Sequence, residues 1–495
     1  MTGLIVEQNL SKAKSLIRKG KTSQAITLYN IILAKFPNNK RAQLGIELLK
    51  PSQQTIDKLL DYCRKGQYDD ATRLALSLTN DFPDHQFGWK VLGALFRQLG
   101  MSSQAVNANQ TAVALSPQDS EAHSNLGVTL KEIGRLEEAE ASLSQAIFLS
   151  SQDAEAHNNL GNTLKELGKL EEAEASLRQA ILLKPKYVEA MINLSLVLDF
   201  MNDLESANLL LQKVLQIDDD NHGLRARVLL AINNFLQGNF KESKRLLLGS
   251  SQIQQNISMT FKNEILYHRY LLKIFELHEH KYFGSKNLSS NKTLYVIGES
   301  HSLTSHWLNV KSSQGNFLCK AKLIMGCMQW HLGNSKRNKY KIKFENIFKS
   351  LPKSCDILLA IGEIDCRLDS GIIKYKNKFP TKDIHEIILI TVENYLTYLF
   401  KNNLEYGHNI IIQGVPCINI DRINSSKKEV IQLIELIKIF NFELKKKSKE
   451  KGFGFLDVYK LTDRGDGLSN GSWHIDEFHL SSEGILEAWR RHYSD

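Results

Sequence analysis

The sequence predicts two parts of different fold class, an α-helical solenoid followed by an α/β domain built on a doubly wound parallel sheet. Three observations support this prediction. Residues 1–250 repeat themselves with a period of 34 residues. Residues 293–495 alternate short β-branched runs with longer amphipathic segments, as strands and covering helices do. A chain of 495 residues is also too long for one ordinary hydrophobic core.

The composition is that of a globular protein, with 42% hydrophobic and 24% charged residues. No apolar run reaches the roughly 18 residues of a membrane-spanning helix. The N-terminus lacks the basic segment and apolar core of a signal peptide. The six cysteines are scattered without a CxxC pair, which favours reduced thiols over disulfides or a zinc site. We therefore expect a cytoplasmic protein without a metal or cofactor.

The net charge of +9 comes entirely from the C-terminal half. Residues 1–250 hold 28 basic and 28 acidic residues, whereas residues 251–495 hold 35 and 26. A basic half could bind an anionic partner, such as an acidic polysaccharide, a nucleic acid or a membrane surface. The alternative is that the lysines are solvated on helix faces. The run Lys445–Lys447 has no interleaved aromatic residues, so nucleic-acid binding is only weakly indicated.

Self-similarity is strongest between residues 122–149 and 156–183, which are identical at 22 of 28 positions. Small residues recur with the same period. They are Gly66, Gly100, Gly134 and Gly168, and Ala71, Ala105, Ala139, Ala173 and Ala207. The alanines suit positions where two helices approach closely, and the glycines suit the left-handed conformation at a helix end.

One unit shows the whole pattern: Trp89, Leu92, Gly93, Phe96, Gly100, Ala105 and Pro117. This pattern resembles the tetratricopeptide repeat. About seven units fit residues 1–250. The first lies near 5–38, an insertion follows at 39–52, the second unit lies at 53–85, four more run to about 221, and a degenerate unit occupies 222–250. The resemblance implies an elongated superhelix whose concave face docks proteins or peptides.

Asn125, Asn159 and Asn193 also recur at 34-residue spacing, at a position that lines the concave groove in such repeats. In the related repeats of the O-linked N-acetylglucosamine transferase, an asparagine ladder at this position holds peptide backbone. The resemblance implies the same chemistry here, since each amide offers a donor and an acceptor. The alternative is that duplication copied a neutral asparagine.

Residues 251–292 read as a joint between the two parts. Residues 261–280 have a helical pattern, and the polar stretch from Gly284 to Lys292 reads as a loop. The pair His278 and His280 would point to different faces of a helix, which argues against a metal site.

The second part, residues 293–495, reads as five strands with helices between them. The predicted strands are 294–297, 321–325, 356–361, 409–413 and 454–458, and the helices lie near 301–310, 340–350, 384–403 and 427–450. This alternation suits a flavodoxin-like doubly wound fold, whose site lies at the carboxyl ends of the strands.

Polar residues that could take part in catalysis follow three of these strands. Ser300 comes directly after the first, although a simple helix cap by Ser302 is the alternative. Asp476 and His479 stand three apart after the fifth strand, a spacing that on a helical turn places a carboxylate beside an imidazole. Such a pair could orient a histidine base towards a serine nucleophile. The alternative is a structural Asp–His pair.

The ordered set of Gly-x-Ser, a Gly-x-x-Asp block and Asp-x-x-His-Leu resembles the SGNH/GDSL hydrolase superfamily over residues 293–495. The resemblance implies that Ser300 is the nucleophile, that Asp476 and His479 complete the triad, and that the Gly326 amide serves the oxyanion hole.

Two positions depart from the superfamily pattern: Glu299 replaces the usual Asp, and Ile364 replaces the oxyanion Asn. We expect Arg367 to replace the missing donor and Asp365 to support the site. The alternative is that Arg367 forms an ion pair with Asp365 or Glu363.

Together these features predict a serine esterase or O-acyltransferase directed by tetratricopeptide repeats. Its substrate would be an acyl ester, for example of a carbohydrate or glycoconjugate. A non-catalytic repeat scaffold with a degenerate SGNH-like domain is the alternative, because of Ile364. A third hypothesis is an adaptor that binds nucleic acid or a membrane surface through its basic half.

Overall fold

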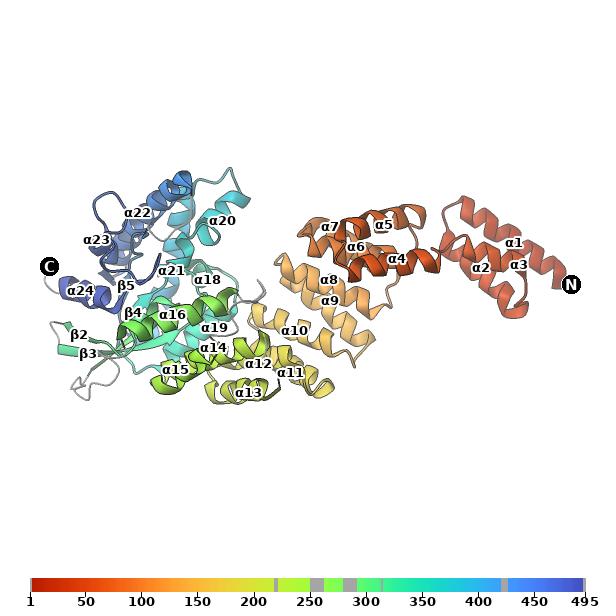
Figure 1. The fold of residues 1–495 in the computed structure, drawn as a ribbon. Coiled ribbons are helices and arrows are strands. Elements are labelled where there is room, and N and C mark those ends of the chain that lie inside the picture. The colour runs from red at the N-terminus through yellow and green to blue at the C-terminus, as the bar shows by residue number, and fades with distance from the viewer. Residues whose placement is uncertain are drawn as a thin grey trace. The chain divides into compact units, whose positions relative to one another are not determined.

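The computed structural model describes residues 2–217, 221–249, 262–278, 292–312, 315–419 and 426–492 (Figure 1). The chain forms two compact units. The first comprises Met1–Leu164 and Ala175–Pro185, and the second comprises Lys165–Glu174 and Lys186–Asp495. The last two helix pairs of the repeat region therefore belong to the same compact unit as the sheet.

Each of the seven predicted repeat units contains one helix pair. The pairs are α1 (Thr2–Arg18) and α2 (Thr22–Lys35), α4 (Gln53–Arg64) and α5 (Tyr68–Asp81), α6 (Gln86–Gln98) and α7 (Ser102–Leu115), α8 (Ser120–Glu132) and α9 (Leu136–Leu149), α10 (Ala154–Leu167) and α11 (Leu170–Leu183), α12 (Val188–Phe200) and α13 (Leu204–Ile217), and α14 (Asn221–Leu236) and α15 (Phe240–Leu248). The insertion between the first two units contains the short helix α3 (Lys40–Glu47).

Close helix packing explains the periodic small residues. The five recurring alanines are at most 1% exposed. A Cβ added to Gly127 on α8 would lie 2.5 Å from Cγ of Leu143 on α9, so a larger residue would push the two helices apart. Gly100 and Gly134 adopt φ values of 72° and 80° between the helices of their pairs, where a side chain would be strained.

The second unit contains a six-stranded mixed sheet with the order β2-β3-β1-β4-β5-β6. The strands are β1 (Lys292–Gly298), β2 (Asn309–Ser312), β3 (Gly315–Leu323), β4 (Asp356–Ala360), β5 (Asn409–Gln413) and β6 (Gly454–Leu456). All neighbours pair in parallel except β2 and β3, which are antiparallel. β1 therefore lies inside the sheet, and its carboxyl end lies between those of β3 and β4.

Helices cover both faces of this sheet (Figure 1). On one face, Ile357 and Leu359 of β4 share a core with α19 (Lys339–Ser350), α21 (Ile384–Tyr406) and α22 (Lys427–Glu450). On the other face, Leu358 packs with α23 (Val458–Thr462) and α24 (Ser482–His492). The alternation of Ile357, Leu358 and Leu359 between two cores explains why this strand reads as a continuous apolar run.

Two sequence predictions for this unit are wrong in extent. The helix expected at 301–310 is only one turn, α17 (His301–Thr304), because Trp307 adopts a φ of 63° and the chain then enters β2. The second predicted strand, 321–325, is instead β3, which begins at Gly315 and forms a hairpin with β2. Short elements that were not predicted are α18 (Gln329–Gly333), the 3₁₀ turn η3 (Ile364–Cys366) and α20 (Gly371–Lys378).

The joint contributes helix α16 (Lys262–His278), which packs on α14 and α15. Glu264 accepts a hydrogen bond of 2.6 Å from Arg225 of α14, and the His268 ring lies 3.0 Å from the carbonyl oxygen of Leu247 on α15. His280 and most of the polar stretch expected at 284–292 lie outside the described residues. Among the residues that are described, no helix has the length and apolar character needed to cross a membrane.

Candidate active site

Ser300 lies at the carboxyl end of the central strand β1. A Cβ at Gly298 would lie 2.4 Å from the carbonyl oxygen of Ala360 on β4, so only glycine fits before the turn. The turn leads directly into α17, and Ser300 occupies its N-cap position. The side chain of Ser302 donates a 2.7 Å hydrogen bond back to the carbonyl oxygen of Glu299, so this hydroxyl stabilises the turn itself.

Asp476 and His479 lie in a loop before α24, which begins only at Ser482. The expected helical turn is therefore wrong. Asp476 Oδ1 accepts hydrogen bonds from the backbone N–H groups of Phe478, at 3.0 Å, and His479, at 2.8 Å. The carboxylate thus folds the loop around itself, which brings the two side chains together without a helix.

Ser300, His479 and Asp476 form a continuous hydrogen-bonded chain. Nδ1 of His479 lies 2.8 Å and 2.9 Å from the two carboxylate oxygens of Asp476. Its Nε2 lies 2.7 Å from Oγ of Ser300. Because Nδ1 faces only acceptors, we assign its proton there, which leaves Nε2 of the neutral ring to accept from Ser300. Ser300 and His479 are 7% and 9% exposed, so the chain is nearly dry.

Glu299 and His301 form a second buried pair beside this chain. Nδ1 of His301 lies 2.6 Å from Oε1 of Glu299, and its Nε2 lies 3.2 Å from the carbonyl oxygen of Phe478. Burial alone would raise the pKa of Glu299, but the hydrogen bond and charge of His301 lower it overall. Burial alone would lower the pKa of His301, but Glu299 raises it overall. Each side chain therefore favours the charged form of the other.

Glu299 also contacts the serine. Its Oε2 accepts a 2.5 Å hydrogen bond from the Ser300 backbone N–H and lies within hydrogen-bond distance of Ser300 Oγ. The single hydroxyl proton of Ser300 therefore has two possible acceptors, Glu299 and His479. The sequence marked Glu299 only as a departure from the family pattern. Nothing in the spacing of residues 299–301 predicted the contacts of Glu299 with Ser300 and His301.

Arg367 forms an ion pair with Glu363, which is one of the alternatives that the sequence left open. Its Nε and one terminal nitrogen lie 2.7 Å and 2.6 Å from the two Glu363 oxygens. The guanidinium also lies over the ring of Phe478, 5.2 Å from its centre. Burial opposes the charge of Arg367, but Glu363 raises its pKa overall. Ile364 begins the 3₁₀ turn between these two charged residues.

Asp365 supports the turn after β3. Its two oxygens accept hydrogen bonds from the backbone N–H groups of Gln329, at 2.7 Å, and Trp330, at 3.2 Å. Burial raises the pKa of Asp365 to about 7, although these bonds lower it in part. Gly326 lies in the same turn with a φ of 69°. A 2.7 Å bond from the Ile324 N–H to the Gly298 carbonyl oxygen joins this turn to the end of β1.

Four buried side chains could in principle hold a metal ion. Glu299, His301, Glu363 and His479 each place one donor atom within 4.8 Å of the others. These donors already have partners, however, since Arg367 binds Glu363, His301 binds Glu299, and Ser300 binds His479. The protein itself thus supplies the counter-charges that a metal ion would supply, and the cluster does not fit a cation well.

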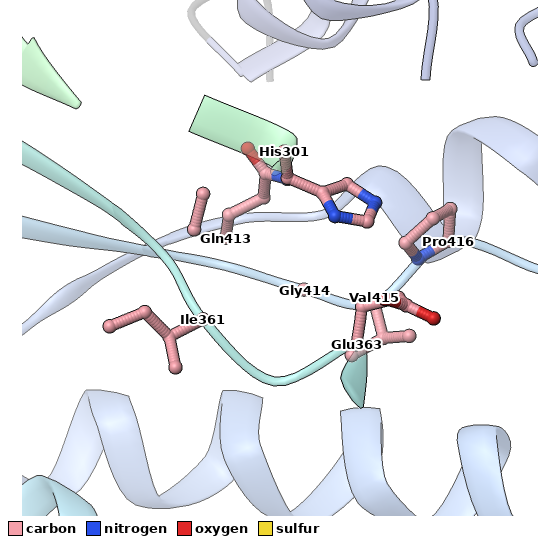
Figure 2. Close-up of a pocket in the computed structure, with 8 residues that line it drawn as sticks. His301, Ile361, Glu363, Gln413, Gly414, Val415 and Pro416 are labelled. Atoms are coloured by element: carbon pink, nitrogen blue, oxygen red, sulfur yellow. The ribbon is translucent and has the colours of Figure 1, made fainter. Parts of the chain in front are cut away.

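A small cavity adjoins the Glu299–His301 pair. Figure 2 shows the loop after β4, with Ile361 and Glu363, and the segment from Gln413 to Pro416 after β5, converging beside His301. Gln413 is 3% exposed, and its Oε1 has no hydrogen-bond partner among the described residues. This space lies at the carboxyl ends of the strands, where open α/β sheets place their ligands.

Aromatic side chains cover His479. The ring of Tyr270 from α16 lies 4.1 Å from the imidazole of His479, measured between ring centres, and the ring of His301 lies 4.5 Å away. Sequence reasoning did not connect Tyr270 with the site, because nothing in the local pattern of the joint marks a contact 209 positions along the chain.

The three asparagines of the predicted ladder differ in their surroundings. Asn125 and Asn159 are half-buried on α8 and α10. Asn193 is only 3% exposed on α12, which packs against α19 through a 3.0 Å ion pair between Asp199 and Lys343. Asn193 is therefore more buried than the other two positions of the predicted ladder.

The helix pairs with their periodic glycines and alanines define an α-solenoid repeat protein. Tetratricopeptide repeat family models match residues 154–187, 108–141 and 10–39, and a TPR repeat model matches residues 129–168. The N-terminal array is thus a tetratricopeptide repeat array. Arrays of this type typically bind proteins or peptides.

Three solved structures are similar to part of this chain. PilW, a type IV pilus biogenesis factor, is 18% identical, with a TM-score of 0.38 over 41% of this chain and 94% of its own. MamA is 23% identical, with a TM-score of 0.30 over 32% of this chain and 91% of its own. A thermophilic TPR protein from Thermus thermophilus is 26% identical, with a TM-score of 0.32 over 37% of this chain and 97% of its own. No curated protein matches the chain.

Proposed function

We propose that this repeat protein is also an enzyme, a serine esterase or O-acyltransferase of the SGNH type. One observation carries the proposal: Oγ of Ser300, Nε2 of His479 and the Asp476 carboxylate form one hydrogen-bonded chain at the carboxyl end of β1. A serine, a base and a group that orients the base are the three parts of a nucleophile system. The three residues are buried at the carboxyl end of a central strand, which is where open α/β sheets place their sites.

The strand order supports the SGNH resemblance. Numbered along the chain, the five parallel strands β1, β3, β4, β5 and β6 lie in the order 2-1-3-4-5. This is the flavodoxin-like order of a doubly wound sheet. The serine follows the first strand, and the aspartate and histidine follow the last, as the superfamily resemblance implies.

The proposed reaction begins when Nε2 of His479 removes the Ser300 proton and Oγ attacks the acyl carbonyl carbon. Asp476 holds the tautomer of His479 and stabilises the imidazolium. The imidazolium then protonates the leaving alcohol, and the acyl group stays on Ser300. Water, or an acceptor hydroxyl in the transferase case, gives its proton to His479 and attacks the acyl carbonyl carbon. The bond between this carbon and Oγ then breaks, which releases the carboxylic acid or the new ester, and His479 returns the proton to Ser300.

The developing oxyanion needs hydrogen-bond donors. The N–H of Ser300 is bound by Glu299, and Ile364 has no polar side-chain group. We assign this role to the Gly326 amide and to the terminal nitrogen of Arg367 that Glu363 does not bind. Removal of one such donor typically costs about 10²-fold or more in rate.

The proposed substrate class is an O-acyl ester, and a carbohydrate or glycoconjugate acceptor follows from the resemblance and the basic C-terminal half. The repeat array would deliver the enzyme to a protein or peptide partner, with Asn125 and Asn159 as contacts to extended backbone. A cytoplasmic location belongs to the same proposal.

A non-catalytic scaffold is the second candidate function. The repeat matches favour it, since docking is the usual work of such arrays, and the hydrophobic Ile364 in place of an oxyanion asparagine points the same way. In that case the buried hydrogen bonds between Ser300, His479 and Asp476 would serve only to stabilise the α/β domain.

Intact mass spectrometry after treatment with a fluorophosphonate separates the two candidates. We expect one adduct on the wild-type chain, none on Ser300→Ala, and one on the matched control Ser305→Ala, because the buried Ser305 hydroxyl has no hydrogen-bond partner among the described residues. Absence of an adduct on folded wild-type protein, or an adduct that persists in Ser300→Ala, would leave the scaffold as the function of this chain.

A further inference from the structure

Two other rings lie against the imidazole of His479. They are those of His301, at 4.5 Å between ring centres and an interplanar angle of 33°, and of Tyr270, at 4.1 Å and 36°. Tyr270 is 4% exposed, so its ring is buried beside the imidazole. His301 and Ser300 belong to the sheet domain, but Tyr270 comes from α16, which precedes the sheet.

The repeat array holds α16 in place. Arg225 binds Glu264, the Leu247 carbonyl oxygen contacts His268, and Phe235 packs edge-on against Phe275 at 5.7 Å. Arg225 and Phe235 belong to α14, and Leu247 belongs to α15. The last helix pair therefore anchors one face of α16, while Tyr270 on the same helix reaches His479. Both contacts lie within one compact unit.

We propose that Tyr270 is a positioning residue for the esterase proposed above, on which this inference rests. Its ring limits rotation of the imidazole, so that Nε2 of His479 stays aimed at Ser300 while Nδ1 stays on Asp476. Its π face also attracts the imidazolium that forms when His479 takes the serine proton. Tyr270 lies on α16, which the last repeat helices α14 and α15 anchor. Residues outside the sheet domain thus help to complete the proposed site.

Several charged groups lie near His479 besides this ring. Asp476 accepts its Nδ1–H, and Glu299 and Glu363 each place an oxygen within 4.8 Å of a His479 nitrogen. Arg367 pairs with Glu363, and His301 pairs with Glu299. These pairs remain when the ring is lost, so Tyr270→Leu should slow the proton transfer because the imidazole is held less tightly.

The test measures the rate constant of fluorophosphonate labelling of the full chain. We expect Tyr270→Leu to lower the rate about threefold to thirtyfold. Tyr270→Phe keeps the ring and should retain the rate. Leu271→Ala is the matched control and should also retain the rate, because it removes a buried side chain of the same helix that makes none of the anchoring contacts above.

Three outcomes overturn the inference: a wild-type rate in Tyr270→Leu, a Tyr270→Phe rate as low as that of Tyr270→Leu, or an equal loss of rate in Leu271→Ala. Thermal unfolding midpoints separate loss of the ring from loss of folding, since Tyr270→Leu and Leu271→Ala should be similarly destabilised. Failure of the wild-type chain to label at all would instead reject the proposed function, and this inference with it.

Discussion

The guanidinium of Arg367 donates two hydrogen bonds to the Glu363 carboxylate. The same group lies over the ring of Phe478, the residue that precedes His479. The ion pair thus joins the turn after β4 to the loop that carries the histidine. Glu363 is nearly buried, with a side chain only 4% exposed, so its charge depends on this partner.

Arg367→Gln should destabilise the chain by about 3 kcal/mol, because it leaves a buried carboxylate without its counter-charge. The double variant Glu363→Gln/Arg367→Gln should recover much of this loss, since no charge is then stranded. Urea denaturation measures both. Arg464→Gln, which breaks an exposed pair with Asp466, is the control and should cost less than about 1 kcal/mol. Equal costs for the two arginines would contradict the prediction.

Asp365 should make stability depend on pH. Its ordinary pKa is near 3.8, and burial raises it to about 7 in the folded state. Between these values the folded chain binds the extra proton, so the free energy of unfolding falls as pH rises from about 4 to about 7. Each unit of difference in pKa corresponds to about 1.4 kcal/mol.

The Asp365 effect is isolated by subtracting the profile of Asp365→Asn from that of the wild type. The subtraction removes other groups, such as His306, whose pKa burial lowers to about 3 and whose contribution has the opposite sign. Chemical denaturation at several pH values provides the data. A difference that stays constant between pH 4 and 8 would show that Asp365 keeps an ordinary pKa.

Asp476 and His479 should act as one unit on Ser300. Asp476→Asn should slow fluorophosphonate labelling by about 10³-fold or more, because the ring loses the acceptor that fixes its tautomer. His479→Ala should cost at least as much, and the double variant little more than His479→Ala alone. Additive losses in the double variant would mean that the two residues affect Ser300 separately.

Metal removal should leave the site unchanged. The donors of Glu299, His301, Glu363 and His479 are already satisfied by protein partners, so incubation with EDTA should not alter the labelling rate of Ser300. A rate that falls with EDTA and returns with added zinc would identify the cluster as a metal site instead.

Gly127→Ala should destabilise the repeat array by about 1–3 kcal/mol. The added Cβ would meet Leu143 at 2.5 Å and the carbonyl oxygen of Ala139 at 3.2 Å. This clash should outweigh the gain of about 1 kcal/mol in helix propensity. Ser144→Ala, at an exposed position of α9, is the control and should stay within about 0.5 kcal/mol of the wild type. Thermal unfolding of both variants decides the matter.

The repeats and most of the sheet could be predicted because their signals are local. A 34-residue period marks each helix pair, and β5 and α22 occupy 409–413 and 427–450 as the sequence predicts. The capping box of Ser426 and Glu429 explains the sharp start of α22. Hairpin β2–β3 was missed, because the turn into it depends on a positive φ at Trp307 rather than on a turn residue such as glycine.

The candidate site could be predicted only in part. Ser300, Asp476 and His479 carry motif spacing that a single sequence displays. The Glu299–His301 pair and the Tyr270 ring have no such spacing, because their roles arise from contacts made after folding. The helical turn expected around Asp476 does not exist, since side-chain bonds to the backbone shape that loop instead.

Ser300 and His479 are 179 positions apart in the chain, and this separation sets the order in which they appear during synthesis. At a typical synthesis rate of about 5–20 residues per second, the ribosome makes Ser300 roughly 9 to 36 seconds before His479. The repeats and α16 emerge earlier still. A nascent chain can thus fold its repeat array well before Ser300 and His479 can meet.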